Sequence, residues 1–144
     1  MLIGEYLHTI DNKNRLSVPS KFRKELGGTV VVTRGLDKCL FLYTVGEWKV
    51  LADKLAKLPL GKSATRSFVR TMIAGATDLE IDSLGRILLP DYLKVYSGLS
   101  EAAVIIGLYN RVEIWNPEIW NKYSLGAKES VEEIAEQLGE SGLY

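Results

Sequence analysis

Two short segments share an aspartate followed four residues later by an arginine: Asp11–Arg15 and Asp82–Arg86. Each segment has the composition of a tight turn, because Asp favours the start of a turn and Asn14 and Gly85, at matching places, tolerate a positive φ. An arginine on a rigid loop can reach phosphate, or the O6 and N7 atoms of guanine. Each aspartate is expected to form an ion pair with its own arginine, and that contact needs no ligand.

Basic and amide side chains surround the first turn. Lys13 lies in mid-turn without an evident charged partner, which favours contact with a ligand. The candidate DNA-binding residues are Asn12, Lys13, Asn14, Arg15, Lys21, Arg23 and Arg86, and the candidate loop-shaping residues are Asp11, Asp82 and Gly85. The second turn has the neutral Ser83 and Leu84 at the places of Asn12 and Lys13, so we expect it to contribute less. Arg66 and Arg70 either extend this basic surface or form a solvated helix face.

The formal net charge of zero is a cancellation between the two parts of the chain. Residues 1–75 carry thirteen Lys/Arg and six Asp/Glu, whereas residues 76–144 carry five and twelve. Association is steered by local potential, so a basic face can coexist with global neutrality. The composition therefore allows a nucleic-acid partner.

Enzymatic chemistries fit the sequence poorly. Gly61–Ser63 resembles the end of a phosphate-binding loop, but Ala56 stands where its first glycine is required. The two motif aspartates could share a proton, although an arginine four residues on favours the ionised form of each. His8 and Cys39 could act as base and nucleophile, but no third group orients them. One histidine and one cysteine also make no zinc site, and we expect no metal, cofactor, small-molecule substrate or catalysis.

The two motifs belong to an internal repeat. Gly4–Pro19 aligns with Gly75–Pro90 at an offset of 71 residues, and Gly35–Trp48 aligns with Gly107–Trp120 at an offset of 72. A copy of about 45 residues cannot bury a stable core alone. We expect the copies to pack about a pseudo-twofold axis, with strands of one completing the sheet of the other. The expected units are a first repeat over 1–60, a linking helix over 61–74, a second repeat over 75–123, and an acidic helix and tail over 124–144.

Each copy is predicted to be β-rich, with two hairpins and a short helix between them. Alternating or β-branched apolar residues predict strands at 29–33, 39–43, 102–106 and 111–115. Pro19 and Pro90 precede short helices at 20–26 and 91–96. Helices are also expected around 48–58 and 64–72. Trp48, Trp115 and Trp120 are expected to pack in the core rather than to stack on bases.

The last part of the chain is predicted to form two helices. A short one starts at Pro117, and a second one covers Ser130–Leu138, where Ser130 and Glu133 have capping-box spacing. The second helix is acidic and has an apolar stripe formed by Val131, Ile134, Ala135 and Leu138. This stripe could contact another subunit or fold back onto its own domain.

Taken together, these motifs resemble the MraZ proteins of bacteria over residues 1–123. The matching residues are Gly4-x-x-x-His8-x-x-Asp11-x-x-x-Arg15-Leu16-x-x-Pro19-x-x-Phe22-Arg23, Arg34-Gly35-x-Asp37-x-Cys39-Leu40, Asp82-x-x-Gly85-Arg86-Ile87-x-x-Pro90 and Asn110-Arg111-x-Glu113-Ile114-Trp115. The resemblance implies an α+β, β-rich fold of two tandem SpoVT-AbrB-like swapped-hairpin modules with flanking helices. It also carries the DNA-contacting arginine of the family onto Arg15. Asn14 departs from the glycine that is usual there.

The same resemblance implies a transcriptional regulator that binds short repeats in the promoter of its own division and cell-wall gene cluster. Its expected partners are double-stranded DNA and further copies of itself in a ring. The alternative is a self-assembling scaffold or protein-interaction module of the same fold without specific DNA binding. The sequence has neither a membrane-length apolar run nor a secretory signal. A cytoplasmic, nucleoid-associated protein is therefore expected.

Overall fold

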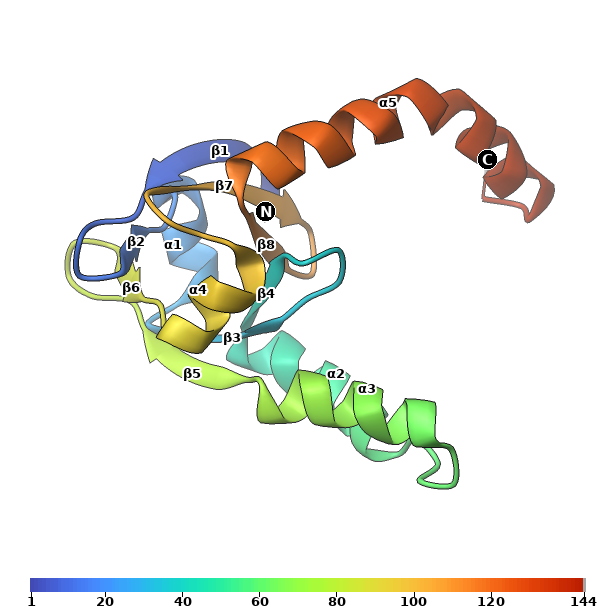
Figure 1. The fold of residues 1–144 in the computed structure, drawn as a ribbon, viewed down its shortest axis with the longest axis horizontal. Helices are drawn as coiled ribbons and strands as arrows, with labels where there is room; N and C mark the ends of the chain where they lie inside the picture. The colour runs from blue at the N-terminus through green and yellow to red at the C-terminus, as the bar shows by residue number, and fades with distance from the viewer. Residues whose placement is uncertain (144) are drawn as a thin grey trace.

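The computed structural model describes residues 1–143 and has the expected α+β, β-rich fold (Figure 1). The first copy contains β1 (Ile3–Thr9), β2 (Arg15–Ser17), α1 (Ser20–Leu26), β3 (Thr29–Arg34), β4 (Leu40–Thr44) and α2 (Val45–Ala56). After α3 (Ser63–Ala74), the second copy contains β5 (Thr77–Glu80), β6 (Arg86–Leu88), α4 (Asp91–Ser97), β7 (Ala102–Leu108), β8 (Val112–Trp115) and α5 (Pro117–Glu140). In Figure 1, the α2–α3 hairpin and α5 extend from the body as two separate arms.

The two copies exchange strands, as expected. One six-stranded sheet has the order β1-β7-β8-β4-β3-β5, and β2 and β6 form a separate two-stranded ribbon. Strand β1 pairs with β7, β5 pairs with β3, and β2 pairs with β6, so every one of these ladders joins the first copy to the second. Replacing each strand by its counterpart reproduces the same order in reverse, as a pseudo-twofold axis requires.

The prediction that each copy begins with a hairpin is wrong, because the two strands that flank the turn do not pair with each other as a ladder. The Asp11–Arg15 turn joins β1 to β2, but within residues 1–143 the bridge between Ile10 and Leu16 is the only ladder contact described for these two segments. Both strands instead find partners in the other copy. The local turn is present, while its flanking strands diverge to different sheets.

Side-chain alternation gives the six-stranded sheet two buried faces. In β4, Leu40 and Leu42 face one core, whereas Phe41 and Tyr43 face the other. The first core is closed by α1, α4 and the β2–β6 ribbon, and the second by α2, α3 and the beginning of α5. Trp115 is 2% exposed and lies in the second core.

Trp48 and Trp120 pack against the second core from α2 and α5. The ring centroids of Trp115 and Trp120 are 5.1 Å apart, and those of Tyr43 and Trp48 are 5.8 Å apart. The expectation that the three tryptophans serve core packing is confirmed.

Helix α5 is one continuous helix of 24 residues, so the prediction of two helices is wrong. Asn116 caps its start, where Oδ1 accepts hydrogen bonds from the N–H groups of Glu118 at 2.8 Å and Ile119 at 3.1 Å. Ser130 and Glu133 lie inside the helix and cap nothing, because no proline or other chain break separates them from the first turns. None of the helices formed by residues 1–143 combines the length and apolar character needed to cross a membrane.

The β1–β7 ladder depends on close backbone contact at Gly107, which faces Gly4 across the pair. A Cβ atom at Gly107 would lie 2.5 Å from the carbonyl carbon of Leu2 and 2.6 Å from the nitrogen of Ile3. We expect Gly107→Ala to lower the free energy of unfolding by about 2 kcal/mol, because the backbone must move to admit the methyl group. Urea denaturation measures this change.

Gly28→Ala is the matched control, since a Cβ atom there meets nothing within 4 Å. Its free energy of unfolding should change by less than about 1 kcal/mol. Equal losses in the two variants would contradict the close-contact argument.

Candidate nucleic-acid interface

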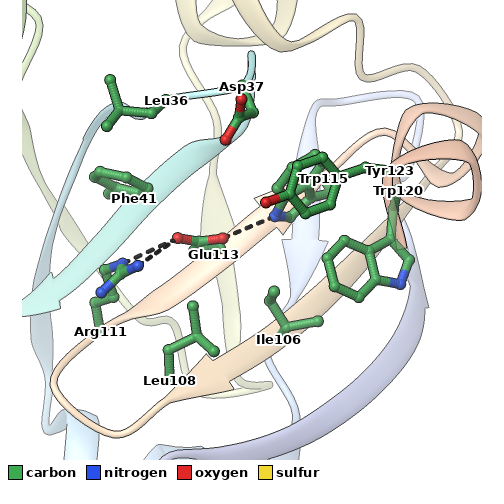
Figure 2. A pocket seen from close by; sticks show the side chains of 10 residues that line it. All are labelled: Leu36, Asp37, Phe41, Ile106, Leu108, Arg111, Glu113, Trp115, Trp120 and Tyr123. Atoms are coloured by element: carbon green, nitrogen blue, oxygen red, sulfur yellow. Dashed lines mark hydrogen bonds and ion pairs between the residues drawn. The ribbon is translucent and has the colours of Figure 1, made fainter. Parts of the chain in front are cut away.

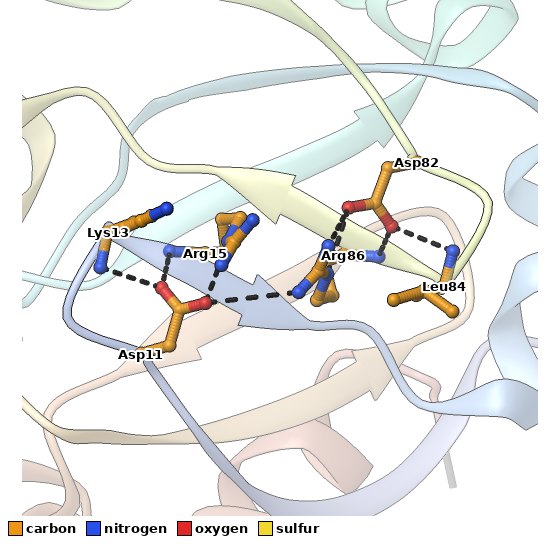
Figure 3. Close-up of polar contacts among 6 residues, drawn as sticks. All are labelled: Asp11, Lys13, Arg15, Asp82, Leu84 and Arg86. Atoms are coloured by element: carbon orange, nitrogen blue, oxygen red, sulfur yellow. Dashed lines mark hydrogen bonds and ion pairs between the residues drawn. The ribbon is translucent and has the colours of Figure 1, made fainter.

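The β2–β6 ribbon places the two motif arginines on one surface (Figure 3). Leu16 pairs with Ile87 at the centre of the ribbon, and both side chains are fully buried in the first core. Because side chains alternate along a strand, Arg15 and Arg86 extend from the opposite, outer face. The inward leucine and isoleucine therefore determine the direction of the arginines.

Each aspartate holds its own turn and arginine together. Asp11 Oδ1 accepts hydrogen bonds from the backbone N–H groups of Lys13 and Arg15, both at 2.9 Å, and its Oδ2 accepts one from Arg15 Nε at 2.7 Å. In the second turn, Asp82 Oδ1 accepts from two backbone N–H groups at 2.9 Å, and its Oδ2 accepts from Arg86 Nε at 2.9 Å. The ion pairs expected from the Asp-x-x-x-Arg spacing are present.

The two arginines differ in the donors that remain available. Arg86 uses both Nε and Nη2 on Asp82, and its Nη1 lies 4.0 Å from Asp11 Oδ2. Arg15 uses Nε on Asp11, and within residues 1–143 its two Nη groups donate no hydrogen bond. The Arg15 side chain is 33% exposed, compared with 24% for Arg86. Arg15 is therefore the better placed of the two to bind a ligand.

Asn14 connects the first loop to the second copy by two side-chain hydrogen bonds. Its φ of 64° is the left-handed conformation that glycine provides at Gly85. Its Nδ2 donates to Asp91 Oδ1 at 2.9 Å, and its Oδ1 accepts from Lys94 Nζ at 2.6 Å. These contacts to α4 occupy the amide, so the side chain of Asn14 positions the loop.

Arg23 makes the equivalent contact to the second loop, because it packs against Gly85. Its guanidinium lies where a Cβ atom of Gly85 would be, and its Nε donates to the carbonyl of Val18 at 3.1 Å. Arg23 and Lys94 occupy equivalent positions in the repeat, 71 residues apart. The alignment of these two cations was the signal in the sequence that could have indicated a structural contact between copies.

The remaining basic candidates divide between the ribbon and a distant arm. Asn12 and Lys13 are exposed in the first loop, and Lys21 is exposed in the first turn of α1, the helix that contacts the second loop through Arg23. Arg66 and Arg70 lie on α3, in the arm that extends away from the ribbon (Figure 1), and Arg66 Nη1 donates to the carbonyl of Leu60 at 2.9 Å. These two arginines do not extend the basic surface around the loops.

The structure does not bring His8 and Cys39 together. His8 lies on the edge strand β1, and β7 and β8 separate that strand from β4 next to Cys39. Cys39 is 1% exposed, and burial raises the pKa of its thiol. Burial and the charge of Arg23 lower the pKa of His8. A buried thiol with a raised pKa is a poor nucleophile.

Sequence reasoning missed a polar group in the second core. Glu113 is 6% exposed, and it accepts hydrogen bonds from Arg111 Nε at 2.9 Å and Trp115 Nε1 at 3.0 Å. It lines a pocket of about 310 Å³ together with aromatic side chains, which include Phe41 and Trp120, and aliphatic side chains, which include Ile106 (Figure 2). The spacing of two residues from Arg111 to Glu113 and from Glu113 to Trp115 could have indicated the contact, because such residues share one face of an extended segment. Both Glu113 oxygens have partners, so the group stabilises the fold.

The Asp11 contacts predict a pH dependence of stability. The backbone N–H of Arg15, followed by its side chain, lowers the pKa of Asp11 from 3.8 to about 2. A carboxylate with a lowered pKa in the folded state stabilises the fold above its unfolded value, and this contribution disappears as the pH falls through about 2. The difference in melting temperature between the wild type and Asp11→Asn should therefore narrow steadily below about pH 4.

Asp53→Asn, which changes an exposed carboxylate on α2, is the control for this comparison. Its difference from the wild type should stay small throughout the pH range. A constant Asp11→Asn difference between neutral pH and about pH 2 would show that the carboxylate contacts do not stabilise the loop.

Comparison with known proteins agrees with the duplicated architecture. The family model described as "MraZ protein, putative antitoxin-like" matches the chain twice, over residues 1–71 and 72–140. A protein named transcriptional regulator MraZ from Alkaliphilus metalliredigens is 48% identical over 143 residues, which cover 99% of this chain and 100% of the relative. A protein of the same name from Natranaerobius thermophilus is 50% identical over 138 residues, which cover 96% of each chain. The chain therefore belongs to the MraZ family.

Proposed function

We propose that this protein regulates transcription by binding double-stranded DNA through the outer face of the β2–β6 ribbon. The observation that carries the proposal is the presence of Arg15 and Arg86 on one side of a single antiparallel ribbon, each held by its own aspartate. The major groove of B-DNA is about 12 Å wide and admits a two-stranded ribbon. Arginines that are oriented beforehand lose less side-chain entropy on binding.

Within this proposal, the first loop makes the larger contribution. The Nη groups of Arg15 read guanine or contact phosphate, and exposed Asn12 and Lys13 add contacts to the DNA backbone. Exposed Lys21 adds a further contact to the DNA backbone from the first turn of α1. Arg86 contributes from the second loop, whose Leu84 offers no charge. Asn14 and Arg23 act indirectly by holding the loops. One such loop pair neutralises roughly two to four phosphates, which is a modest and salt-sensitive interaction.

The proposed function therefore includes assembly. Several copies in a ring would present identical ribbons to short repeats in the promoter of the protein's own division and cell-wall gene cluster, and linked weak contacts give avidity. Residues 1–60 and 75–123 serve as the two SpoVT-AbrB-like modules, 61–74 links them, and 124–144 remains for contacts outside them. The proposed place of action is the nucleoid in the cytoplasm.

The second candidate function is a self-assembling scaffold of the same fold. The outer part of α5 favours it, because this part of the helix extends away from the body and leaves Val131, Ile134 and Leu138 exposed. A scaffold would assemble without salt-sensitive uptake of DNA, so a DNA titration separates the two functions.

Arg15→Ala should weaken binding to a DNA fragment from upstream of the protein's own gene. Removing one bidentate hydrogen-bonded pair costs about 1–3 kcal/mol, and repetition across an assembly should make specific binding unmeasurable. The slope of log affinity against log salt should fall by about 1 for each phosphate that the variant no longer neutralises. Arg86→Ala should weaken binding less. Fluorescence anisotropy at several salt concentrations measures all three effects.

Lys38→Ala is the matched control, because it removes an exposed cation in the turn between β3 and β4, which lies away from the ribbon and outside both arms (Figure 1). It should leave affinity and salt slope unchanged. Lys13→Ala is a further variant of the proposed DNA site. It should reduce the slope of log affinity against log salt without removing a side-chain interaction inside the protein. Unchanged binding by both Arg15→Ala and Lys13→Ala, with melting temperatures near the wild type, would refute the ribbon as the DNA site.

A further inference from the structure

The outer part of α5 carries apolar side chains that its own chain leaves uncovered. Leu125, Val131, Ile134 and Leu138 are 61%, 56%, 45% and 40% exposed. The stripe expected from the sequence is thus present, but it does not fold back onto its own domain. Exposed apolar residues gathered on one element commonly mark an interaction surface.

The α2–α3 hairpin carries a second exposed set. Its exposed large apolar residues are Val45, Val50, Leu58, Leu60, Phe68 and Ile73. Leu55 of α2 and Met72 of α3 are buried and attach the hairpin to the sheet. The hairpin therefore uses part of its apolar surface for its own core and presents the remainder to solvent.

The two arms carry opposite charges. Residues 44–75, which contain the hairpin, have six Lys/Arg and two Asp/Glu, whereas residues 125–140 of α5 have one Lys and five Glu. Their net charges are therefore +4 and −4. Surfaces with matching apolar residues and opposite charge attract each other and exclude wrong partners.

A contact between these arms within one chain is ruled out by their arrangement. In Figure 1, the outer part of α5 and the hairpin extend from different ends of the sheet and lie far apart. Pairing α5 with α5 of a second copy would place two segments of charge −4 side by side, and like charges at an interface are costly. A second copy can, however, supply a hairpin of the opposite charge.

We propose that α5 of one copy docks along the α2–α3 hairpin of the next copy. The contact joins two different surfaces, so each copy uses its helix on one neighbour and its hairpin on the other. Such head-to-tail contacts form a closed ring when the rotation closes. The β2–β6 ribbon lies at the far side of the body from both arms, so docking leaves the loops accessible (Figure 1). The inference rests on the proposed assembly of identical copies.

A pair of charge-reversal variants tests this contact without DNA. The helix variant changes Glu129, Glu132, Glu133 and Glu136 to Lys, and the hairpin variant changes Lys54, Lys57, Lys62 and Arg70 to Glu. All eight side chains are exposed, so both variants should retain the circular dichroism spectrum of the wild type. Native mass spectrometry at low salt should give oligomers for the wild type and monomers for each variant. An equimolar mixture of the two variants should recover the wild-type subunit number, because each supplies the surface that the other lacks.

Wild-type protein provides a second measurement that needs no substitution. A carbodiimide reagent joins a Glu carboxylate directly to a Lys amine that contacts it. In a mixture of 15N-labelled and unlabelled protein, we expect crosslinks between residues 129–140 and 49–62 that join a labelled to an unlabelled peptide. Their absence from the wild-type oligomer would overturn the proposed contact.

The variants distinguish failure of the contact from failure of the assembly. A hairpin variant that keeps the wild-type mass, or a mixture that stays monomeric, would overturn the α5–hairpin contact alone. A wild-type protein that is monomeric at low salt would overturn the assembly as well. None of these results tests the contact of a single ribbon with DNA, which the Arg15→Ala titration measures separately.

Discussion

Burial of Leu16 against Ile87 across the pseudo-twofold axis is the constraint on which the candidate site depends. Each side chain comes from a different copy, and both are fully buried in the first core. Because neighbouring residues on a strand face opposite sides, this burial turns Arg15 and Arg86 outward on one surface. A slip of one residue in the ribbon would bury the arginines and expose the aliphatic side chains. The hydrophobic core and the candidate site are therefore set by the same register.

Each loop is also shaped by the copy to which it does not belong. Asn14 in the first loop contacts Asp91 and Lys94 on α4, while Arg23 on α1 covers Gly85 in the second loop. The two contacts occupy equivalent positions in the repeat but differ in chemistry. In the first loop, the amide of Asn14 has two polar partners, whereas in the second loop Gly85 lies beneath the guanidinium of Arg23. The first loop can thus keep a left-handed residue without glycine. This exchange also explains why neither copy would present its loop correctly alone.

Features with local causes could be predicted from the sequence. The turn composition, the Asp–Arg spacing and the proline before each short helix led to the loops, the ion pairs and helix α1 as the structure has them. Pairing partners were harder, because β1 and β7 are about a hundred residues apart and either could satisfy a local hairpin instead. The role of Arg23 was missed because a cation beside a basic loop has the same sequence pattern whether it faces DNA or a glycine. The continuity of α5 was missed because an internal Ser–Glu pair resembles a helix start.

The net charge of zero can now be assigned to particular parts of the molecule. If α5 docks on the hairpin of a neighbour, the charges of −4 and +4 on those arms cancel between copies. Residues 1–43 retain seven Lys/Arg and four Asp/Glu, whereas residues 76–124 retain four and seven. The remaining imbalance therefore lies between the two halves of the repeated fold, and residues 1–43 form the positive half. An assembly built in this way needs no overall positive charge to bind DNA, because its arms neutralise each other and leave the basic surface of the first copy beside the ribbon.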